Sequence, residues 1–272
     1  MTKVQTEASN PYADVILGGL FQSDDDSYYD NLEQYTAVNA KDQTVTDPNG
    51  YYTYLDMQYM CLIVNTELEE KLGVEIKGYK DLLDPKLKGY VILADPASTS
   101  SGFRQFTTML QLCDGGTYAD DTAWDYITSL MENSVSTTSS STVYKSVMEG
   151  EYAVGLSYES IVQYQIESGA TNIRLVYPEE GNTACASGGA MVKNCPNRAA
   201  AEAMLDLLGC EEMQEARAQA NCARGTNVNF TYAGYPADSE IGVQDLDFGY
   251  IGEHKAELLD KWATLWEDHG SK

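Results

Sequence analysis

The chain has 272 residues and 43% of them are apolar, so it is long enough to bury a sizeable core and too apolar for a disordered chain. It carries 42 Asp and Glu residues against 17 Lys and Arg residues, which gives a formal net charge of -25. This balance excludes nonspecific binding to nucleic acid or anionic lipid. It does not exclude an anionic small molecule, because a site built from backbone N–H groups needs no net positive charge.

The sequence shows neither a membrane anchor nor a leader. No apolar run reaches the length of a membrane span, and MTKVQTEASNPYADV lacks the apolar segment of a signal peptide. Taken alone, these features predict a cytoplasmic protein. The six cysteines form no CxxC pair and only two histidines exist, which argues against a zinc site. We expect buried thiols, with a Cys210–Cys222 or Cys185–Cys195 disulfide as the alternative for an exported protein.

Strands and helices alternate along the first two thirds of the chain. ADVILGG is a short strand that ends in a Gly-Gly turn, and PNG is a turn before two strands, the second of which (MCLIVN) is apolar throughout. The helix ELEEKLG and the buried strand GYVILA follow. Further helices are predicted over 102–115, 122–134 and 143–148, then a strand over 152–158 and a helix over 159–169.

The last third continues this pattern. TNIRLVYPEEG and TACASGGAMVKN are predicted strands, residues 197–210 and 211–221 are helices, and 252–270 form an amphipathic helix. The alternation predicts an α/β fold with mainly parallel sheets. Two passages, MCLIVNT and IRLVYPEEG, predict two lobes between which the chain crosses and returns. We expect lobe 1 to comprise residues 1–62 and 178–272, and lobe 2 to comprise residues 63–177.

One strand-to-helix turn is unusually rich in hydroxyl groups. The segment ASTSSG, residues 97–102, follows GYVILA and precedes a helix. Ligands of open α/β sheets bind beyond the carboxyl ends of strands, where helix N-termini offer unpaired N–H groups. Four hydroxyl groups, on Ser98, Thr99, Ser100 and Ser101, add donors suited to an oxyanion, and Gly102 follows them. The alternative is an N-cap with surplus serines, because serine and threonine are favoured there in any case.

Other strand ends have a similar character. Gly18 and Gly19 offer bare backbone, Tyr158 and Glu159 open a helix directly after a strand, and Ser187 lies in ASGGA. Residues 135–142, VSTTSSST, precede another helix and are alternatively a flexible loop. Together these segments predict one binding cleft between the lobes.

At this point the chain resembles bacterial extracytoplasmic solute-binding proteins of ABC importers, which have the type II periplasmic-binding fold. The branch it resembles binds ferric iron, aminoethylphosphonate or sugar phosphates. The resemblance is carried by NPYADVILGG, DPNGYYTYLDMQYMCLIVNTELEEKLG, YKDLLDPKLKGYVILADPASTSSGF, MEGEYAVGLSYES and LVYPEEG, in order along nearly the whole chain. It implies capture of one solute between two lobes and delivery to a membrane permease, with no catalysis, no cofactor and no catalytic residues. Closure would occur about hinges near residues 61–65 and 173–178.

The same resemblance suggests which solute is bound. The ASTSSG segment favours a phosphorylated sugar, a phosphonate or a similar organophosphate. Arg224 aligns with a family segment near the cleft and would pair with the anion, with Arg104 as a second partner; the alternative for Arg224 is an ordinary surface arginine. Glu159 would hold an ammonium or a sugar hydroxyl, or simply complement the helix dipole. Ferric iron is the runner-up, although this chain has only Tyr158 where iron binders have adjacent tyrosines.

The resemblance also implies an incomplete first lobe. Family members begin with a signal peptide, a strand, a helix and a second strand, so roughly 50–60 residues precede the matching part, more than a βαβ unit needs at minimum. An incomplete lobe would expose sheet edges and favour self-association. The resemblance implies a location outside the cytoplasm, in the periplasm or lipid-anchored at the cell surface.

Two hypotheses of other classes remain open. One is an enzyme acting on a small phosphorylated molecule, although the sequence has no GxSxG, HExxH or Walker motif. The other is a fragment that acts only by associating with a partner chain. Turnover would support the first, and a stable oligomer that binds no solute would support the second.

Overall fold

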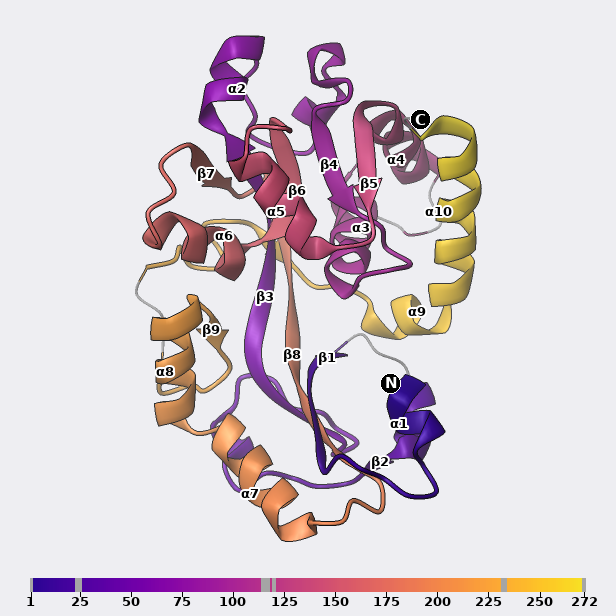
Figure 1. Ribbon diagram of the computed structural model, residues 1–272, viewed down its shortest axis with the longest axis vertical. Helices are drawn as coiled ribbons and strands as arrows, with labels where there is room; N and C mark the ends of the chain where they lie inside the picture. Colours follow the sequence, from indigo (N-terminus) through magenta and orange to yellow (C-terminus); the bar gives the residue numbers. More distant parts are fainter. Residues whose placement is uncertain (1, 23–25, 114–117, 119–120, 231–233, 271–272) are drawn as a thin grey trace. The chain divides into compact units, whose positions relative to one another are not determined.

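The computed structural model describes residues 2–22, 26–113, 118, 121–230 and 234–270 (Figure 1). The chain divides into two compact units. Unit 1 consists of Met1–Gln58, Cys185–Tyr235 and Phe248–Glu253, and unit 2 of Tyr59–Ala184, Pro236–Asp247 and His254–Lys272. Two of the passages from one unit to the other lie inside long strands, β3 (Tyr52–Asn65) and β8 (Asn182–Val192).

Unit 2 contains the parallel strands that the sequence predicts. β4 (Val91–Ala94) pairs in parallel with both β5 (Ser134–Thr137) and β6 (Val154–Tyr158). The C-terminal half of β3 pairs antiparallel with β6 and with β7 (Ile173–Val176), and β10 (Val243–Gln244) runs parallel to the start of β8. All four residues of β4 are buried, as expected of an apolar strand covered on both faces.

The helices of unit 2 begin and end at residues that favour those positions. They are α2 (Thr66–Leu72), α3 (Ser100–Leu112), α4 (Asp121–Asn133), α5 (Ser140–Met148), α6 (Glu159–Glu167) and α10 (Lys255–His269). At the start of α2, Oδ1 of Asn65 accepts hydrogen bonds from the N–H groups of Glu67 and Leu68, at 3.1 and 3.0 Å. Gly73 ends the helix at φ 62°, a left-handed conformation that favours glycine.

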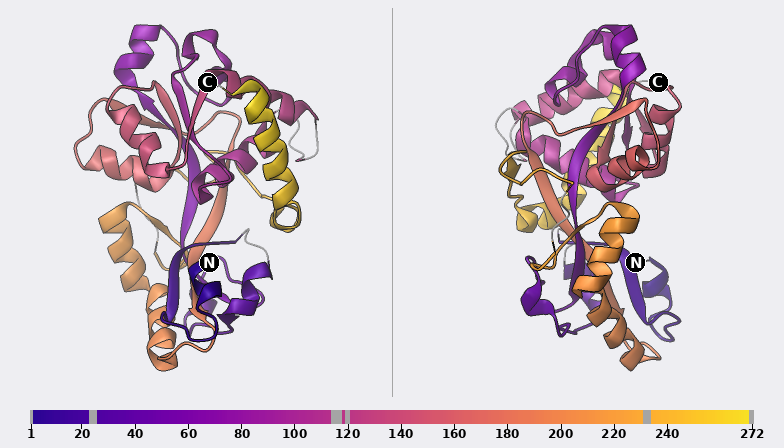
Figure 2. Two further views of the ribbon diagram at one scale, coloured as in Figure 1. Left: turned by 45° about the vertical axis from the view of Figure 1, so that its right-hand side comes forward. Right: turned by 90° about the vertical axis from the view of Figure 1, so that its left-hand side faces the viewer.

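Helix α10 packs against α3 and α4 (Figures 1 and 2). Trp262 is 3% exposed, and its ring meets the ring of Phe106 edge-on at 5.1 Å. Phe106 also contacts Trp124, and Nζ of Lys261 lies 4.2 Å from the centre of the Trp124 ring. We expected lobe 1 to include all of residues 178–272, whereas these aromatic contacts bury α10 on unit 2.

Unit 1 is built on antiparallel ladders. β1 (Val15–Phe21) and β2 (Leu32–Glu33) pair with β8, and β9 (Arg224–Gly225) pairs with β3. The mainly parallel pairing expected from the sequence therefore holds around β4 but not in unit 1. β1 and β8 are not consecutive in the chain, because β2 to β7 lie between them, so the crossover rule for consecutive parallel strands does not set their relative direction. The helices of unit 1 are α1 (Thr2–Thr6), α7 (Arg198–Leu208), α8 (Glu211–Asn221) and α9 (Phe248–Glu253).

Two local expectations differ from the structure. The two strands expected after the PNG turn are one continuous strand, β3, of 14 residues. Neither suggested disulfide is formed, because Cys195 and Cys210, one member of each pair, carry free thiols. Cys61 is also a free thiol, and burial raises its pKa well above the usual value, so it stays protonated.

Candidate functional site

Three neighbouring strands of unit 2 end at one edge, and a helix follows each of them. β4 runs parallel to β5 and β6, and the register pairs Ala94 with Thr137. After these strands, α3 begins at Ser100, α5 at Ser140 and α6 at Glu159. Helix N-termini at the carboxyl ends of parallel strands present unpaired N–H groups, which is where α/β folds bind ligands. This edge is the candidate site of unit 2.

The turn between β4 and α3 uses part of its hydroxyl groups to hold its own shape. Ser98 Oγ donates to Asp95 Oδ2 at 2.5 Å. Thr99 is the N-cap of α3: its Oγ1 accepts from the N–H of Gly102 at 3.0 Å and donates to the carbonyl of Asp95 at 3.2 Å. A Cβ at Gly102 would collide with the carbonyl oxygen of Ala94. Ser98, Thr99 and Gly102 therefore shape the turn.

The remaining serines link the first turns of two helices. Ser101 Oγ and Ser140 Oγ lie 2.5 Å apart, so a hydrogen bond joins α3 to α5. Ser139 Oγ lies 3.0 Å from Ser141 Oγ in the same first turn of α5, and Ser100 is exposed. In a hydrogen bond between two hydroxyl groups, one group donates its O–H and the other accepts. The O–H of the accepting group remains available to a ligand oxygen. Residues 135–142 are thus the end of β5 and the start of α5, and not an irregular loop.

The end of β6 places a carboxylate inside unit 2. Glu159 is 2% exposed, and its Oε1 accepts a hydrogen bond from Tyr177 Oη at 2.5 Å. Tyr158 precedes it and is half-buried. Arg104, expected as a second anion partner, is 2% exposed and lies against Phe103. Both charged groups are part of the interior of unit 2.

Unit 1 has its own polar and glycine positions. Gly18 and Gly19 are exposed, have φ values of 79° and 73°, and lie where the β1–β8 register shifts between Leu17 and Leu20. No atom lies within 4 Å of a Cβ built at either glycine, so backbone conformation, not space, requires them. The shift places this bulge beside Gly188, the residue after Ser187.

Ser187 forms a cluster with two residues that the sequence did not indicate. Its hydroxyl donates to Asp56 Oδ1, and Arg217 Nη2 donates to Asp56 Oδ2. Asp56 lies on β3 and Arg217 on α8, so distant segments meet here. Arg224 lies on the strand beside β3, where it pairs with Met57, the residue after Asp56.

Arg224 is half-buried and its side chain has a defined contact. Its guanidinium carbon lies 4.7 Å from the centre of the Tyr235 ring, a cation–π contact. The hydroxyl of Tyr235 in turn donates to the carbonyl of Cys222 at 2.6 Å. This chain of contacts fixes the side chain on the end of β9.

The predicted site residues fall into two sets. Ser98, Thr99, Ser100, Ser101, Gly102, Tyr158 and Glu159 belong to unit 2, and Gly18, Gly19, Ser187 and Arg224 belong to unit 1. Within unit 2 the β4 and β6 ends are neighbours through the parallel β4–β6 pairing. Within unit 1 the glycine bulge and Ser187 are neighbours through the β1–β8 ladder.

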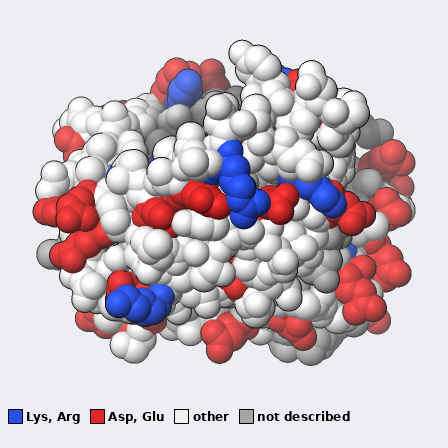
Figure 3. Space-filling view, turned by 90° about the horizontal axis from the view of Figure 1, so that it is seen from below, with Lys and Arg blue, Asp and Glu red and all other residues white. Residues whose placement is uncertain are grey.

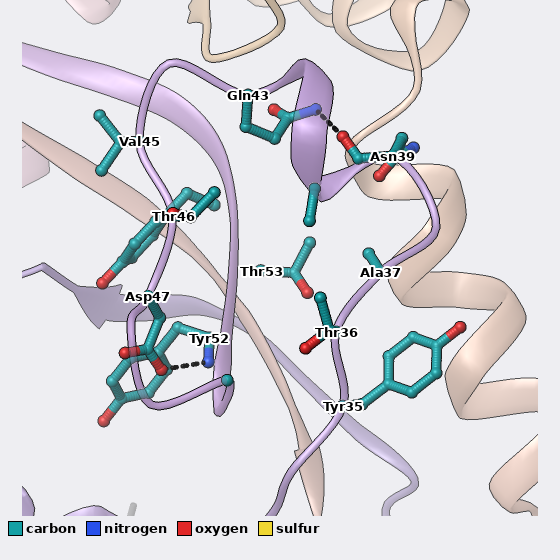
Figure 4. A pocket seen from close by; sticks show the side chains of 13 residues that line it. Tyr35, Thr36, Ala37, Asn39, Gln43, Val45, Thr46, Asp47, Tyr52 and Thr53 are labelled. Atoms are coloured by element: carbon teal, nitrogen blue, oxygen red, sulfur yellow. Dashed lines mark hydrogen bonds between the residues drawn. The ribbon is translucent and has the colours of Figure 1, made fainter.

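Unit 1 also contains a pocket lined by residues between Tyr35 and Tyr54 (Figure 4). Gln43 Nε2 donates to the carbonyls of Asn39 and Gly209, at 3.3 and 2.7 Å. The carboxylate of Asp47 accepts from the N–H of Tyr52 at 2.9 Å. These hydrogen bonds hold the loop that surrounds the pocket.

The surface charge follows the composition. Figure 3 shows a face on which Asp and Glu side chains are widely spread and Lys and Arg side chains are few. Within the described part of the chain, no three His, Cys, Asp or Glu residues gather as a metal site would require. A helix with the length and apolar character of a membrane span is also missing from those residues.

The α/β fold of this chain is that of the periplasmic binding proteins. The family described as bacterial extracellular solute-binding protein matches residues 10–233, and the chain belongs to this family. Its members are transport proteins that bind solutes for ABC importers.

Several known proteins are similar over nearly the whole chain. The periplasmic binding protein AfuA from Actinobacillus pleuropneumoniae, solved with fructose 6-phosphate bound, is 27% identical, with a TM-score of 0.84 over 98% of this chain and 86% of AfuA. The periplasmic binding protein P5PA is 24% identical, with a TM-score of 0.83 over 97% of this chain and 86% of that one. An uncharacterized protein of Haemophilus influenzae is 28% identical over 96% of this chain and 78% of its own length. Iron-bound HitA from Pseudomonas aeruginosa, at 19% identity and a TM-score of 0.78, shares the fold.

Proposed function

We propose that this protein binds a small organic phosphate, a sugar phosphate in the first place, at the hydroxyl-rich edge of unit 2. The observation that carries the proposal is the Ser101–Ser140 hydrogen bond, which holds the first turns of α3 and α5 together. Two helix N-termini side by side direct N–H groups and partial positive charge at the same place. The fructose 6-phosphate bound by the similar protein AfuA supports this class of solute.

This edge suits an anion in a protein of net charge -25 because it needs no lysine or arginine. Backbone N–H groups and serine hydroxyls hydrogen-bond phosphate oxygens directly. Ser100, Ser101 and Ser140 are the side chains that we assign to the phosphate. Ser98, Thr99 and Gly102 act indirectly, because they fix the backbone of the turn.

The bound solute is passed to the membrane permease of an ABC importer, and the protein works outside the cytoplasm. The family, described as bacterial extracellular solute-binding protein, supports this role. We therefore propose a carrier rather than an enzyme. Nucleic acid is not a partner of so acidic a surface.

A panel of thermal melts tests this function. The full chain is heated alone and with fructose 6-phosphate, glycerol phosphate, aminoethylphosphonate, inorganic phosphate or ferric citrate. A ligand that binds only the folded state raises the melting temperature. We expect a rise with the sugar phosphate. A rise with ferric citrate alone would replace the proposal by iron binding, and turnover of the phosphate ester would replace it by an enzyme.

A further inference from the structure

Strand β1 of unit 1 has one edge that pairs with no other strand among the residues that the structure describes. On its other side β1 pairs with β8, and β3 lies beyond β8 (Figure 1). In an antiparallel ladder, alternate residues direct their N–H and C=O groups to opposite sides. The carbonyl of Asp14 accepts a hydrogen bond from the N–H of Val192 in β8, at 3.0 Å. Val15 and Leu17 therefore direct their backbone groups away from β8.

This edge lacks two of the features that usually prevent another strand from pairing with it. Soluble proteins protect exposed edges with charged residues or proline. The sequence of β1, VILGGLF, contains neither, although 22% of the whole chain is charged. A bulge also protects an edge, but the register shift between Leu17 and Leu20 leaves residues 15–17 in a regular ladder. Residues 15–17 are thus the segment with which a further strand would pair.

Apolar surface lies beside this edge, on the face of β1 that α7 covers. Val15 packs against the apolar cluster that contains Leu205 and Leu208 of α7. Leu17 lies on the same face, because its Cδ1 and that of Leu208 lie 3.5 and 3.3 Å from a Cβ built at Gly189. Leu17 is nevertheless 49% exposed. An apolar side chain is therefore only partly covered at the unpaired edge.

A hollow lies next to the start of β1. Its lining is Tyr12, Ala13, Asp14, Val15, Ala200, Ala201 and Met204. Tyr12 is 83% exposed. The carboxylate of Asp14 accepts hydrogen bonds from the N–H and from Nδ2 of Asn197, at 2.7 and 3.0 Å, and so ties the start of β1 to the start of α7. Exposed apolar side chains gathered in this way mark a surface that contacts another molecule.

We propose that two copies of this chain associate through the β1 edges of unit 1. A twofold axis beside Ile16 pairs residues 15–17 of the two strands in antiparallel, so that Val15 of each copy lies opposite Leu17 of the other. Opposite side chains in such a ladder lie about 5 Å apart. Each Leu17 therefore comes to the hollow of the other copy, which Val15 lines.

The charge of the chain and the layout of this surface favour a second copy as the partner. The backbone template, Leu17 and the hollow lie together on unit 1, as an interface between identical surfaces requires. With 42 Asp and Glu residues against 17 Lys and Arg residues, two copies repel each other on most faces, whereas β1 has no charged residue. The paired segment is short, so the dimer is weak and depends on protein concentration. No solute takes part, so the inference is independent of the proposed function.

Sedimentation equilibrium of the full chain over a series of concentrations tests the dimer. We expect the mass to rise from that of one chain towards that of two. Leu17→Lys should weaken the dimer by about tenfold or more, because a lysine on an edge strand opposes pairing. Val228→Lys is the matched control, with the same change of charge at a residue that is 56% exposed and follows β9, which pairs with β3 and not with β1. The mass of one chain throughout the series, or an equally stable dimer of Leu17→Lys, would overturn the proposal.

A second measurement uses the unaltered protein, so it holds even if a variant fails to fold. Hydrogen exchange of single N–H groups is compared at low and at high protein concentration. We expect slower exchange of the Val15 and Leu17 N–H groups at high concentration, because they gain acceptors in the second copy. The N–H of Val192, which is already bonded to Asp14, is the reference. A dimer that leaves the exchange of Val15 and Leu17 unchanged would place the interface elsewhere and contradict the proposal.

Discussion

Ser101 and Ser140 belong to different helices, and their hydroxyl oxygens lie 2.5 Å apart at the carboxyl edge of the unit 2 sheet. The contact exists because β4 and β5 are parallel neighbours, which brings the starts of α3 and α5 to the same edge. Neither serine acts alone in this arrangement. The pair is the structural basis of the proposed phosphate site.

Replacing both serines by alanine should weaken the binding of fructose 6-phosphate. Each lost hydrogen bond to a charged group costs about 1.5–3 kcal/mol, so we expect at least a tenfold loss of affinity. The measurement is calorimetric titration of Ser101→Ala/Ser140→Ala. Ser129→Ala is the control, because the Ser129 hydroxyl bonds within α4 to the carbonyl of Asp125. Equal affinity of all three proteins would remove the serine pair from the site.

Gly102→Ala should destabilise unit 2 and disturb binding at the same edge. The added Cβ would collide with the carbonyl oxygen of Ala94 and would lie 2.7 Å from Thr99 Oγ1. The backbone of this turn would therefore have to move. Overpacking of this kind costs about 1–3 kcal/mol. Urea unfolding measures the loss, with Ser129→Ala at an exposed position of α4 as control. A variant as stable as wild type would show that the turn is more adaptable than its contacts indicate.

Trp262→Ala should loosen α10 from unit 2. The ring is 3% exposed and packs on Phe106, and removing a buried tryptophan costs about 3–5 kcal/mol. Hydrogen exchange should then accelerate in α10, α3 and α4 but not in unit 1. Exposed Glu267→Ala serves as the control. Faster exchange in unit 1 instead would contradict the assignment of α10 to unit 2.

Glu69 should make stability depend on pH in the acid range. Burial tends to raise the pKa of this carboxyl, but hydrogen bonds from Arg174 and from the N–H of Ile76, with the charge of Arg174, outweigh burial and lower it. A carboxyl whose pKa is lower in the folded state than in the unfolded state stabilises the fold at pH values above its unfolded-state pKa. This contribution is lost as pH falls through its folded-state pKa. Glu69→Gln should therefore be less stable than wild type at pH 7, with a smaller difference near pH 3. If the denaturant midpoints of wild type and Glu69→Gln differ by the same amount at pH 7 and near pH 3, the stabilising role of the Glu69–Arg174 ion pair is contradicted.

The sequence was sufficient for features that depend on neighbouring residues. The apolar run of β4, the N-terminus of α3 and the Gly73 helix end were all readable from local patterns. The hydroxyl-rich ASTSSG segment was likewise visible, but the sequence did not show which of its residues shape the turn and which face a ligand. Whether Ser98 faces Asp95 or a ligand depends on side-chain rotamers, which spacing does not reveal.

Features that depend on distant pairing were not predictable. Arg217 looks like one of several charged residues on a polar helix, and Asp56 like a polar interruption in a strand. Only the fold shows that they meet, through contacts 161 residues apart in the chain. The antiparallel ladders of unit 1 and the packing of α10 on unit 2 depend on the same kind of distant contact.

The measurement that tests the central claim most directly is calorimetric titration of the full chain with fructose 6-phosphate and, separately, with fructose. If the hydroxyl-rich edge of unit 2 binds the phosphate, fructose 6-phosphate should bind saturably at one site, and fructose far more weakly. Equal affinities, or no binding of the phosphate ester, would contradict the assignment of this edge to an anion.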